Sequence, residues 1–374
     1  MVIPLDPTHS LDEELPEEPL DDGPRDLEQE DRPRRIRQTT FDDRLEIFGS
    51  LVGSFALVWV LYGHVFNFSG LLGFLVCWYL AFMVTLTLIV RMSHPRPIVI
   101  DRLAQATIWV ASAIVMVALG STLIYTFSKG WAAIHRWSFW SQTMSGVSPT
   151  APLAKGGVLH AIVGTVIEVA IAVAISLPLG LITAVYLSEV GGRLSNVVRT
   201  VVEAMTALPE ILAGLFVYVF LIVYLGWPKS GLAVSLAMSV TMIPIIARTG
   251  EVALRIVPNG LREAAGALGG SDWRTTWRVV LPTASSGLAT ALILAIARGV
   301  GETAIPLLVS GASTFMNVNP LSNPMNSLPL FIFTGYETHQ SVAIERAFGA
   351  ASILMLIVLV LFVILRFVTR ERRA

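Results

Sequence analysis

The sequence has 374 residues, of which 54% are hydrophobic and 14% charged, whereas a soluble domain carries about 25% charged residues. Its formal charge of −1 combines two opposite parts, because residues 1–46 carry −9 and residues 47–374 carry +8. This composition excludes a single soluble domain and predicts an integral membrane protein. The lone cysteine, Cys77, excludes a disulfide framework and a cysteine-ligated metal site.

Residues 1–46 are acidic and rich in proline, so they cannot bury enough apolar surface to offset the entropy of ordering. We expect them to form a disordered cytoplasmic tail. No basic segment precedes a short apolar stretch at the N-terminus, which argues against a cleaved signal peptide. The rest of the chain divides into an extra transmembrane hairpin over 47–100 and a larger membrane domain over 101–374.

Eight apolar segments predict an all-α membrane protein with about eight transmembrane helices. Most segments reach the roughly 20 residues that span the hydrocarbon core. Only 232–247 is short, with 16 residues, and it must draw on its flanks or on neighbouring helices. The predicted spans are 47–66, 71–90, 103–128, 158–187, 204–227, 232–247, 284–310 and 342–365.

Basic residues are distributed unevenly between the two sides that these spans define. With the N-terminus inside, twenty of the 26 Lys and Arg residues fall in inside segments and five in outside segments, and Arg298 lies within a span. Cytoplasmic loops carry the excess of basic residues. We therefore expect both termini to be cytoplasmic.

Prolines and acidic residues interrupt the segments from residue 158 onward, which places the working part in the C-terminal two-thirds. Glu168 has apolar neighbours, and we favour a role in interhelical packing over one in the pathway. Glu203 and Glu210 flank Pro209, where a broken helix would expose backbone groups to a substrate.

The longest inside loop, residues 248–282, calls for an explanation because the other inside turns are short. Within it, 261–268 predicts a short helix that ends at Gly269 and Gly270. A second amphipathic stretch begins at Asp272 as N-cap and stops at Pro282. The sequence leaves two interpretations open, an interfacial helix lying on lipid and a docking site for another protein.

The spacing within this loop resembles the EAA loop of ABC-transporter permease subunits. Their pattern EAA-x3-G-x9-I-x-LP matches residues 263–282, with Val279 in the place of Ile. The resemblance implies a coupling helix that seats in a groove of an ATPase subunit. The residues assigned to this coupling are Glu263, Ala264, Ala265, Gly269 and Pro282.

A second motif, AIARGVGETAIPLL at 295–308, places charges in the middle of a span. An arginine at mid-bilayer costs about 2.5–3.5 kcal/mol on insertion scales. Arg298 and Glu302 are four residues apart, so both lie on one helical face and can pair. Thr303 adds a hydroxyl, and we expect Pro306 to prevent a regular helix beyond it. One alternative is an ion pair that only fixes helix register. The other is an anion site, in which Glu302 holds the forked N–H donors of the Arg298 guanidinium in place until the substrate arrives.

The run R-x-x-GETA-x-PLL is similar to the phosphate-importing branch of the ABC permease family, from which it departs by the extra Ile305. Segments 164–189, 246–269 and 327–333 share the resemblance, which covers about 155–370. It implies a type I importer fold with six core helices in a bacterial inner membrane. The implied partners are a dimer of ATPase subunits, a second permease subunit and an extracytoplasmic phosphate-binding protein. Arg298 and, less directly, Arg248 would bear on phosphate translocation.

No motif in the chain predicts ATP hydrolysis, a metal or a cofactor. The phosphate-cradling pattern G-x4-G-K-[ST] is absent, and the six histidines show no metal-ligand spacing. We therefore expect a transport subunit whose energy comes from a partner. The alternatives are a permease for another oxyanion, the partner phosphate permease, or a gradient-driven transporter or channel, for which an EAA loop has no use.

Overall fold

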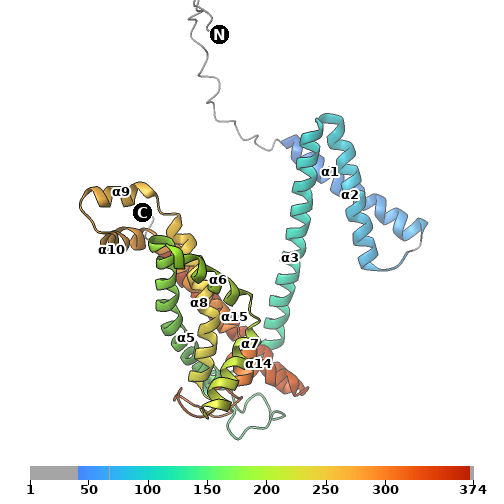
Figure 1. The fold of residues 1–374 in the computed structure, drawn as a ribbon. Helices are drawn as coiled ribbons and strands as arrows, with labels where there is room; N and C mark the ends of the chain where they lie inside the picture. Colours follow the sequence, from blue (N-terminus) through green and yellow to red (C-terminus); the bar gives the residue numbers. More distant parts are fainter. Residues whose placement is uncertain (1–40, 67, 371–374) are drawn as a thin grey trace, which may run out of the picture. The chain divides into compact units, whose positions relative to one another are not determined.

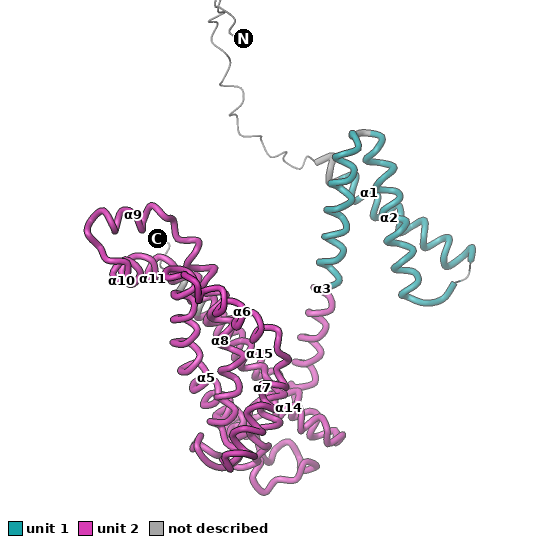
Figure 2. Tube along the Cα trace, viewed as in Figure 1, with its two compact units in different colours: residues 1–114 teal, residues 115–374 magenta. Residues whose placement is uncertain are grey.

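The computed structural model describes residues 41–66 and 68–370, and every regular element within these ranges is helical (Figure 1). Residues 1–40 of the predicted tail therefore lie outside the described residues. The predicted end of the tail at residue 46 was wrong, because residues 41–46 are the start of the first helix. The chain divides into two compact units, residues 1–114 and 115–374, and helix α3 (Arg96–Ile134) runs across the boundary (Figure 2).

The first unit contains the hairpin that the sequence predicts. Helix α1 (Phe41–Val60) continues as a π-helical turn, η1 (Leu61–Val65), and packs against α2 (Leu71–Ser93). Aromatic rings join the two helices, with the ring centroid of Phe55 lying 5.2 Å from that of Trp78 and 5.6 Å from that of Phe74. The Trp78 indole also donates to the carbonyl of Leu51 at 3.3 Å.

The second unit is a helical bundle built around α5 and α8, which pack along much of their length. After α3 its helices are α4 (Trp137–Ser141), α5 (Leu159–Val185), η2 (Tyr186–Val190), α6 (Arg193–Ala207), α7 (Glu210–Val217), η3 (Tyr218–Tyr224), α8 (Gly231–Arg255), α9 (Asn259–Ala267), α10 (Asp272–Thr275), η4 (Thr276–Val280), α11 (Leu281–Thr283), α12 (Ser285–Val300), α13 (Ala304–Val309), α14 (Leu328–Glu337) and α15 (Ser341–Arg370).

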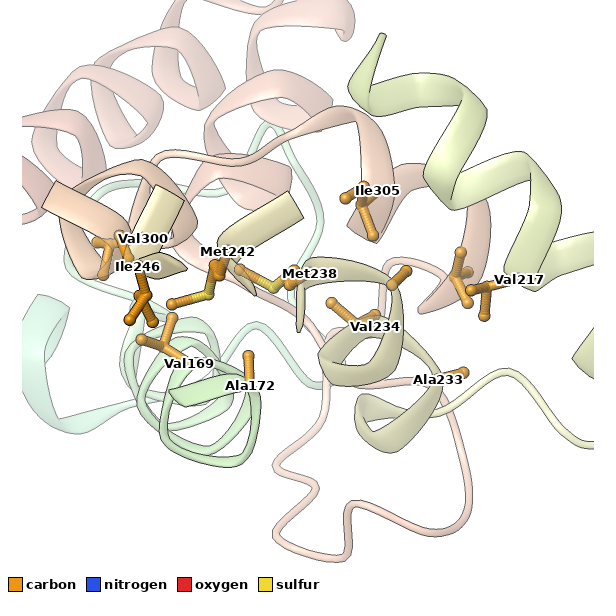
Figure 3. Close-up of a cluster of buried hydrophobic side chains, with 13 residues drawn as sticks. Val169, Ala172, Val217, Ala233, Val234, Met238, Met242, Ile246, Val300 and Ile305 are labelled. Carbon is orange, nitrogen blue, oxygen red and sulfur yellow. The ribbon is translucent and has the colours of Figure 1, made fainter. Parts of the chain in front are cut away.

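Small and flexible side chains allow these helices to approach closely. Figure 3 shows the centre of the bundle, where α5, α7, α8, α12 and α13 meet around Met238 and Met242. A Cβ atom on Gly180 would lie 2.7 Å from the Cβ atom of Ile246, so α5 and α8 can touch here only because residue 180 is glycine. Because hydrocarbon tails are as apolar as leucine, such packing rather than hydrophobic burial holds membrane helices together.

Within residues 41–66 and 68–370, six helices are long and apolar enough to cross a membrane, or up to eight if each of two bent helix pairs forms one span. The all-helical membrane fold expected from the sequence is therefore confirmed. The fifth predicted span, 204–227, is broken at Leu208 and Pro209, where α6 and the α7–η3 segment meet at 99°. The seventh, 284–310, follows a 72° bend after Thr283 and breaks again between Val300 and Ala304.

The short sixth segment, 232–247, is part of a 25-residue helix, α8. The predicted span ended at Ala247, just before Arg248. In the structure the helix continues, and Glu251, only 2% exposed, forms ion pairs with Arg199, Arg248 and Arg255 at 2.7, 3.2 and 2.8 Å. These ion pairs offset part of the positive charge of the three arginines, and the helix extends to Arg255.

A buried arginine near the start of α15 holds the loop between α4 and α5. Arg346 is 1% exposed and donates to the backbone carbonyls of Pro149, Ala151, Pro152 and Lys155 at 2.9–3.2 Å. These carbonyls accept hydrogen bonds from the Nη1 and Nη2 groups of the guanidinium, and no carboxylate pairs with Arg346 among the described residues. The loop is thereby fixed to the end of the bundle away from α9 and α10 (Figure 1).

Candidate functional site

The Arg298 side chain pairs with Glu210, and not with Glu302 as we predicted. Arg298 lies in the last turn of α12, and Glu210 is the first residue of α7, just after the 99° break. The two side chains are 52% and 30% exposed. The ion pair therefore links two interrupted spans and remains open on one side.

Glu302 has a different task, because α12 ends at Val300 and the face shared by positions i and i+4 does not exist beyond it. The Glu302 carboxylate, 7% exposed, accepts hydrogen bonds from the backbone N–H groups of Ala304 and Ile305 at 3.0 and 3.4 Å. These are among the first N–H groups of α13, which have no partner within the helix. Glu302 thus stabilises the restart of the chain after the break.

Thr303 and Pro306 complete this restart. Thr303 is the residue that precedes the first turn of α13, and Pro306 lies within that turn. The expectation that Pro306 prevents a regular helix was wrong, because a proline in the first turn removes an N–H that needs no helical partner. Helix α13 packs against α7, where a Cβ on Gly214 would lie 3.3 Å from the Cα of Ile305. This packing fixes the start of α7 relative to α12.

Arg248 lies apart from the Arg298 pair, in the cluster around Glu251. Its guanidinium pairs with Glu251 and, at 3.4 Å, with Glu203 of α6. Arg199 of α6 binds the same Glu251 carboxylate. The cluster ties α6, which leads into the broken span, to the segment of α8 that leads to α9.

The loop 248–282 contains the short helix that the sequence predicts. Helix α9 spans Asn259–Ala267, and Gly269 follows it with φ of +78°, a conformation that favours glycine. We predicted Asp272 as the N-cap, and this was wrong. Ser271 takes that position, and Asp272 is the first helical residue of α10. Both residue types favour helix starts, so the sequence alone does not fix the register.

The predicted coupling residues lie on an accessible surface. Glu263, Ala264, Gly269 and Pro282 are exposed, and Ala265 is half-buried. Large apolar side chains are exposed beside them, namely those of Leu261, Leu268, Trp273 and Trp277. Exposed apolar groups gathered on one loop are typical of a docking surface.

Arg262 holds α9 to the rest of the bundle. Its guanidinium forms two hydrogen bonds with the Glu189 carboxylate at the end of η2, at 2.9 and 3.1 Å, and donates to the carbonyls of Val257 and Leu254. The bond to Glu189 raises the pKa of the Arg262 guanidinium above its ordinary value. These bonds tie α9 to η2 and α8 together.

Glu168 is buried in α5, and its surroundings support the packing role. Its carboxylate accepts a hydrogen bond from Ser310 at 3.3 Å, and its backbone carbonyl accepts one from Ser235 of α8 at 2.9 Å. Ser310 begins the segment that connects α13 to α14. Glu168 thus joins that segment to α5 and α8.

Sequence reasoning missed the two partners that organise these regions, Glu251 for Arg248 and Glu189 for Arg262. Glu251 had a local signal, because it follows Arg248 by three positions and precedes Arg255 by four on one helix. Glu189 is 73 residues from Arg262, and no local spacing indicates such a pair.

The chain is similar to known transport proteins. Residues 176–373 match the family described as "Binding-protein-dependent transport system inner membrane component". The phosphate transport system permease protein PstA 1 of Mycobacterium tuberculosis is 37% identical over 287 residues, which cover 74% of this chain and 92% of that protein. The permease protein PstA of Mycobacterium leprae is 36% identical over 269 residues, covering 70% and 88%.

Among solved structures, an inward-facing form of the MetNI methionine ABC transporter matches with a TM-score of 0.46 and 22% sequence identity, over 58% of this chain and 94% of that one. The family match covers the two broken spans, α8, the EAA loop and α15. The chain belongs to the family of inner membrane components of binding-protein-dependent transport systems.

Proposed function

We propose that this chain is the transmembrane permease subunit of an ATP-driven importer of inorganic phosphate, in which it forms half of the translocation pathway. The observation that carries the proposal is the open Arg298–Glu210 pair at the junction of two broken spans. Broken helices inside membranes supply helix ends and charged groups to substrates. A guanidinium offers a planar fork of donors that suits a tetrahedral oxyanion.

The pathway residues that we propose are Arg298, Glu302, Thr303 and Arg248, now with distinct tasks. Arg298 contacts the anion, while Glu302 and Thr303 shape the turn that positions it. Arg248 acts farther along, where its 48% exposed side chain leaves donors accessible beside Glu251. The identity to phosphate permeases over most of the chain supports phosphate as the anion.

The energy for transport comes from a dimer of ATPase subunits that docks on α9 and α10. Glu263, Ala264, Ala265 and Gly269 form the docking helix and its end, and Pro282 ends the loop. A second permease subunit supplies the other half of the pathway, and an extracytoplasmic binding protein delivers phosphate. The bond between Arg262 and Glu189 fixes the loop to the bundle, which supports the docking role over an interfacial helix lying on lipid. Exposed Leu268, Trp273 and Trp277 offer apolar contacts to the docked subunit.

The chain lies in the bacterial inner membrane with both termini in the cytoplasm. The distribution of Lys and Arg supports this orientation. It places α9 and the Glu251 cluster on the cytoplasmic side and the loop held by Arg346 on the outer side.

Phosphate uptake by cells that depend on this chain tests the proposal. Arg298→Gln should abolish uptake of radiolabelled phosphate while the subunits still purify together. Arg298→Lys keeps the charge but loses the fork, so uptake should fall without vanishing. Arg136→Gln, at an exposed position beside α4, is the matched control. Normal uptake by Arg298→Gln would refute the proposal.

A further inference from the structure

The Arg298–Glu210 pair presents two opposite kinds of hydrogen-bonding group side by side. The guanidinium has five N–H donors and no acceptor, whereas an ionised carboxylate only accepts. Their side chains are 52% and 30% exposed, so each keeps accessible atoms beyond the contact that joins them. A substrate that reaches Arg298 therefore also meets the Glu210 carboxylate.

We propose that Glu210 is a specificity-determining residue, which accepts a hydrogen bond from the proton of the substrate oxyanion. The site then takes tetrahedral oxyanions that carry a proton near neutral pH, such as phosphate and arsenate, and rejects sulfate, which carries none. This inference rests on the proposed phosphate transport and adds a role for Glu210. Arg298 supplies the attraction, and Glu210 supplies the discrimination.

Arg298 alone would not distinguish one oxyanion from another. An arginine without a neighbouring acid attracts any small oxyanion of suitable shape. A carboxylate beside it imposes like-charge repulsion on every anion, which can cost several kcal/mol. Only an anion with an O–H group recovers part of that cost, by donating to the carboxylate. Building an unfavourable contact against the wrong ligand is a general way to obtain specificity.

The structure holds Glu210 firmly enough for this role. It is the first residue of α7, where the positive end of the helix dipole favours an ionised carboxylate. One turn later Gly214 packs on Ile305 of α13, and the first N–H groups of α13 are satisfied by Glu302. The Glu210 carboxylate is therefore carried by a helix, α7, that packs against α13, and not by a flexible loop.

Competition binding to the purified transporter, without the extracytoplasmic binding protein that would otherwise select the anion first, tests the inference. Bound radiolabelled phosphate is measured with increasing sulfate or arsenate for the wild type, Glu210→Gln and Glu210→Asp. Glutamine has the size of glutamate and offers N–H donors in place of one oxygen. Glu210→Ser is a second neutral variant, with a residue favoured at helix starts. Glu337→Gln, exposed at the end of α14, is the control.

We expect sulfate to displace phosphate from the two neutral variants at concentrations at least about tenfold lower than those needed for the wild type. A site built for a substrate hydroxyl can reject its analogue by about 10⁴ when fully buried, and partial exposure reduces that limit here. Arsenate should compete with all forms, and Glu210→Asp and Glu337→Gln should still reject sulfate. If Glu210 were purely structural, its replacement would lower phosphate binding without admitting sulfate.

Two results would overturn the inference and leave the proposed function intact. One is phosphate binding by both neutral variants that stays as insensitive to sulfate as that of the wild type. The other is a wild type that does not respond to arsenate. Failure of the proposed function would instead appear as absence of phosphate uptake by the wild type itself.

Discussion

Breaking the link between Arg262 and Glu189 should weaken the mechanical connection of α9 to the bundle. Glu189→Gln removes the charge of the carboxylate while keeping its size. The two hydrogen bonds lost or weakened measure 2.9 and 3.1 Å, and the paired side chains are 23% and 12% exposed. This pair is therefore intermediate between surface and buried ion pairs.

That position sets the magnitude of the effect. Exposed ion pairs contribute about 0.2–1 kcal/mol, whereas removing one partner of a buried pair costs about 3–5 kcal/mol. Arg262 keeps its bonds to the carbonyls of Val257 and Leu254 in the variant, at 2.6 and 3.0 Å. We therefore expect a loss of about 1–2 kcal/mol for Glu189→Gln. Arg262→Gln loses the carbonyl bonds as well and should cost more.

The assay measures ATP hydrolysis and phosphate transport together in vesicles containing the purified transporter. We expect Glu189→Gln to retain ATP hydrolysis but to move less phosphate for each ATP consumed, because motion of α9 is transmitted less faithfully to α5. A double-mutant cycle on unfolding in detergent should give a coupling of about 1 kcal/mol between the two residues. Glu337→Gln is again the control.

Unchanged transport per ATP together with a coupling below about 0.3 kcal/mol would refute this reasoning. The pair would then be an incidental contact. Loss of ATP hydrolysis itself would point to failed docking of the ATPase, which binding of the purified subunits distinguishes.

Three further variants test other parts of the structure. Gly269→Ala forces a side chain into a left-handed conformation at about 1–2 kcal/mol and should reduce ATPase co-purification, while Gly266→Ala on α9, which meets open space, should not. Glu302→Ala leaves the first N–H groups of α13 unpaired and should lower the unfolding temperature and phosphate uptake, whereas Glu302→Gln, which keeps an acceptor, should do so less. Arg346→Lys cannot reach the four carbonyls that Arg346 binds, so protease cleavage within residues 143–158 should become faster.

Local patterns predicted α9 and the turn after it because their causes are local. Glycine readily adopts the positive φ that ends a helix sharply, and Gly269 does so here. The predicted helix 261–268 needed no distant partner to be identified. The observed helix begins two residues earlier, at Asn259. Membrane spans were likewise predictable, because twenty apolar residues carry their own signal.

The pairing of Arg298 could not be predicted in the same way. The expectation of a bond to Glu302 assumed one continuous helix, and α12 ends between the two residues. Where a helix breaks depends on what its neighbours satisfy: here the carboxylate of Glu302 itself caps the next helix, and Pro209 starts the one that carries Glu210. The true partner is 88 positions away, and only packing of α7 on α13 brings it near.

Stability alone does not explain an ion pair at this junction. Each helix end in a membrane exposes backbone groups whose desolvation costs several kcal/mol when unpaired. Here Glu302 accepts hydrogen bonds from such groups, and Pro209 and Pro306 at the helix starts have no N–H to satisfy. Charged side chains at membrane depth are costly. Selection for stability alone therefore gives no reason for Arg298 and Glu210 to stand at these positions. Their partial exposure at two helix breaks is understandable if an anion passes there, because irregular backbone and charge are tolerated at membrane depth where they line a polar route.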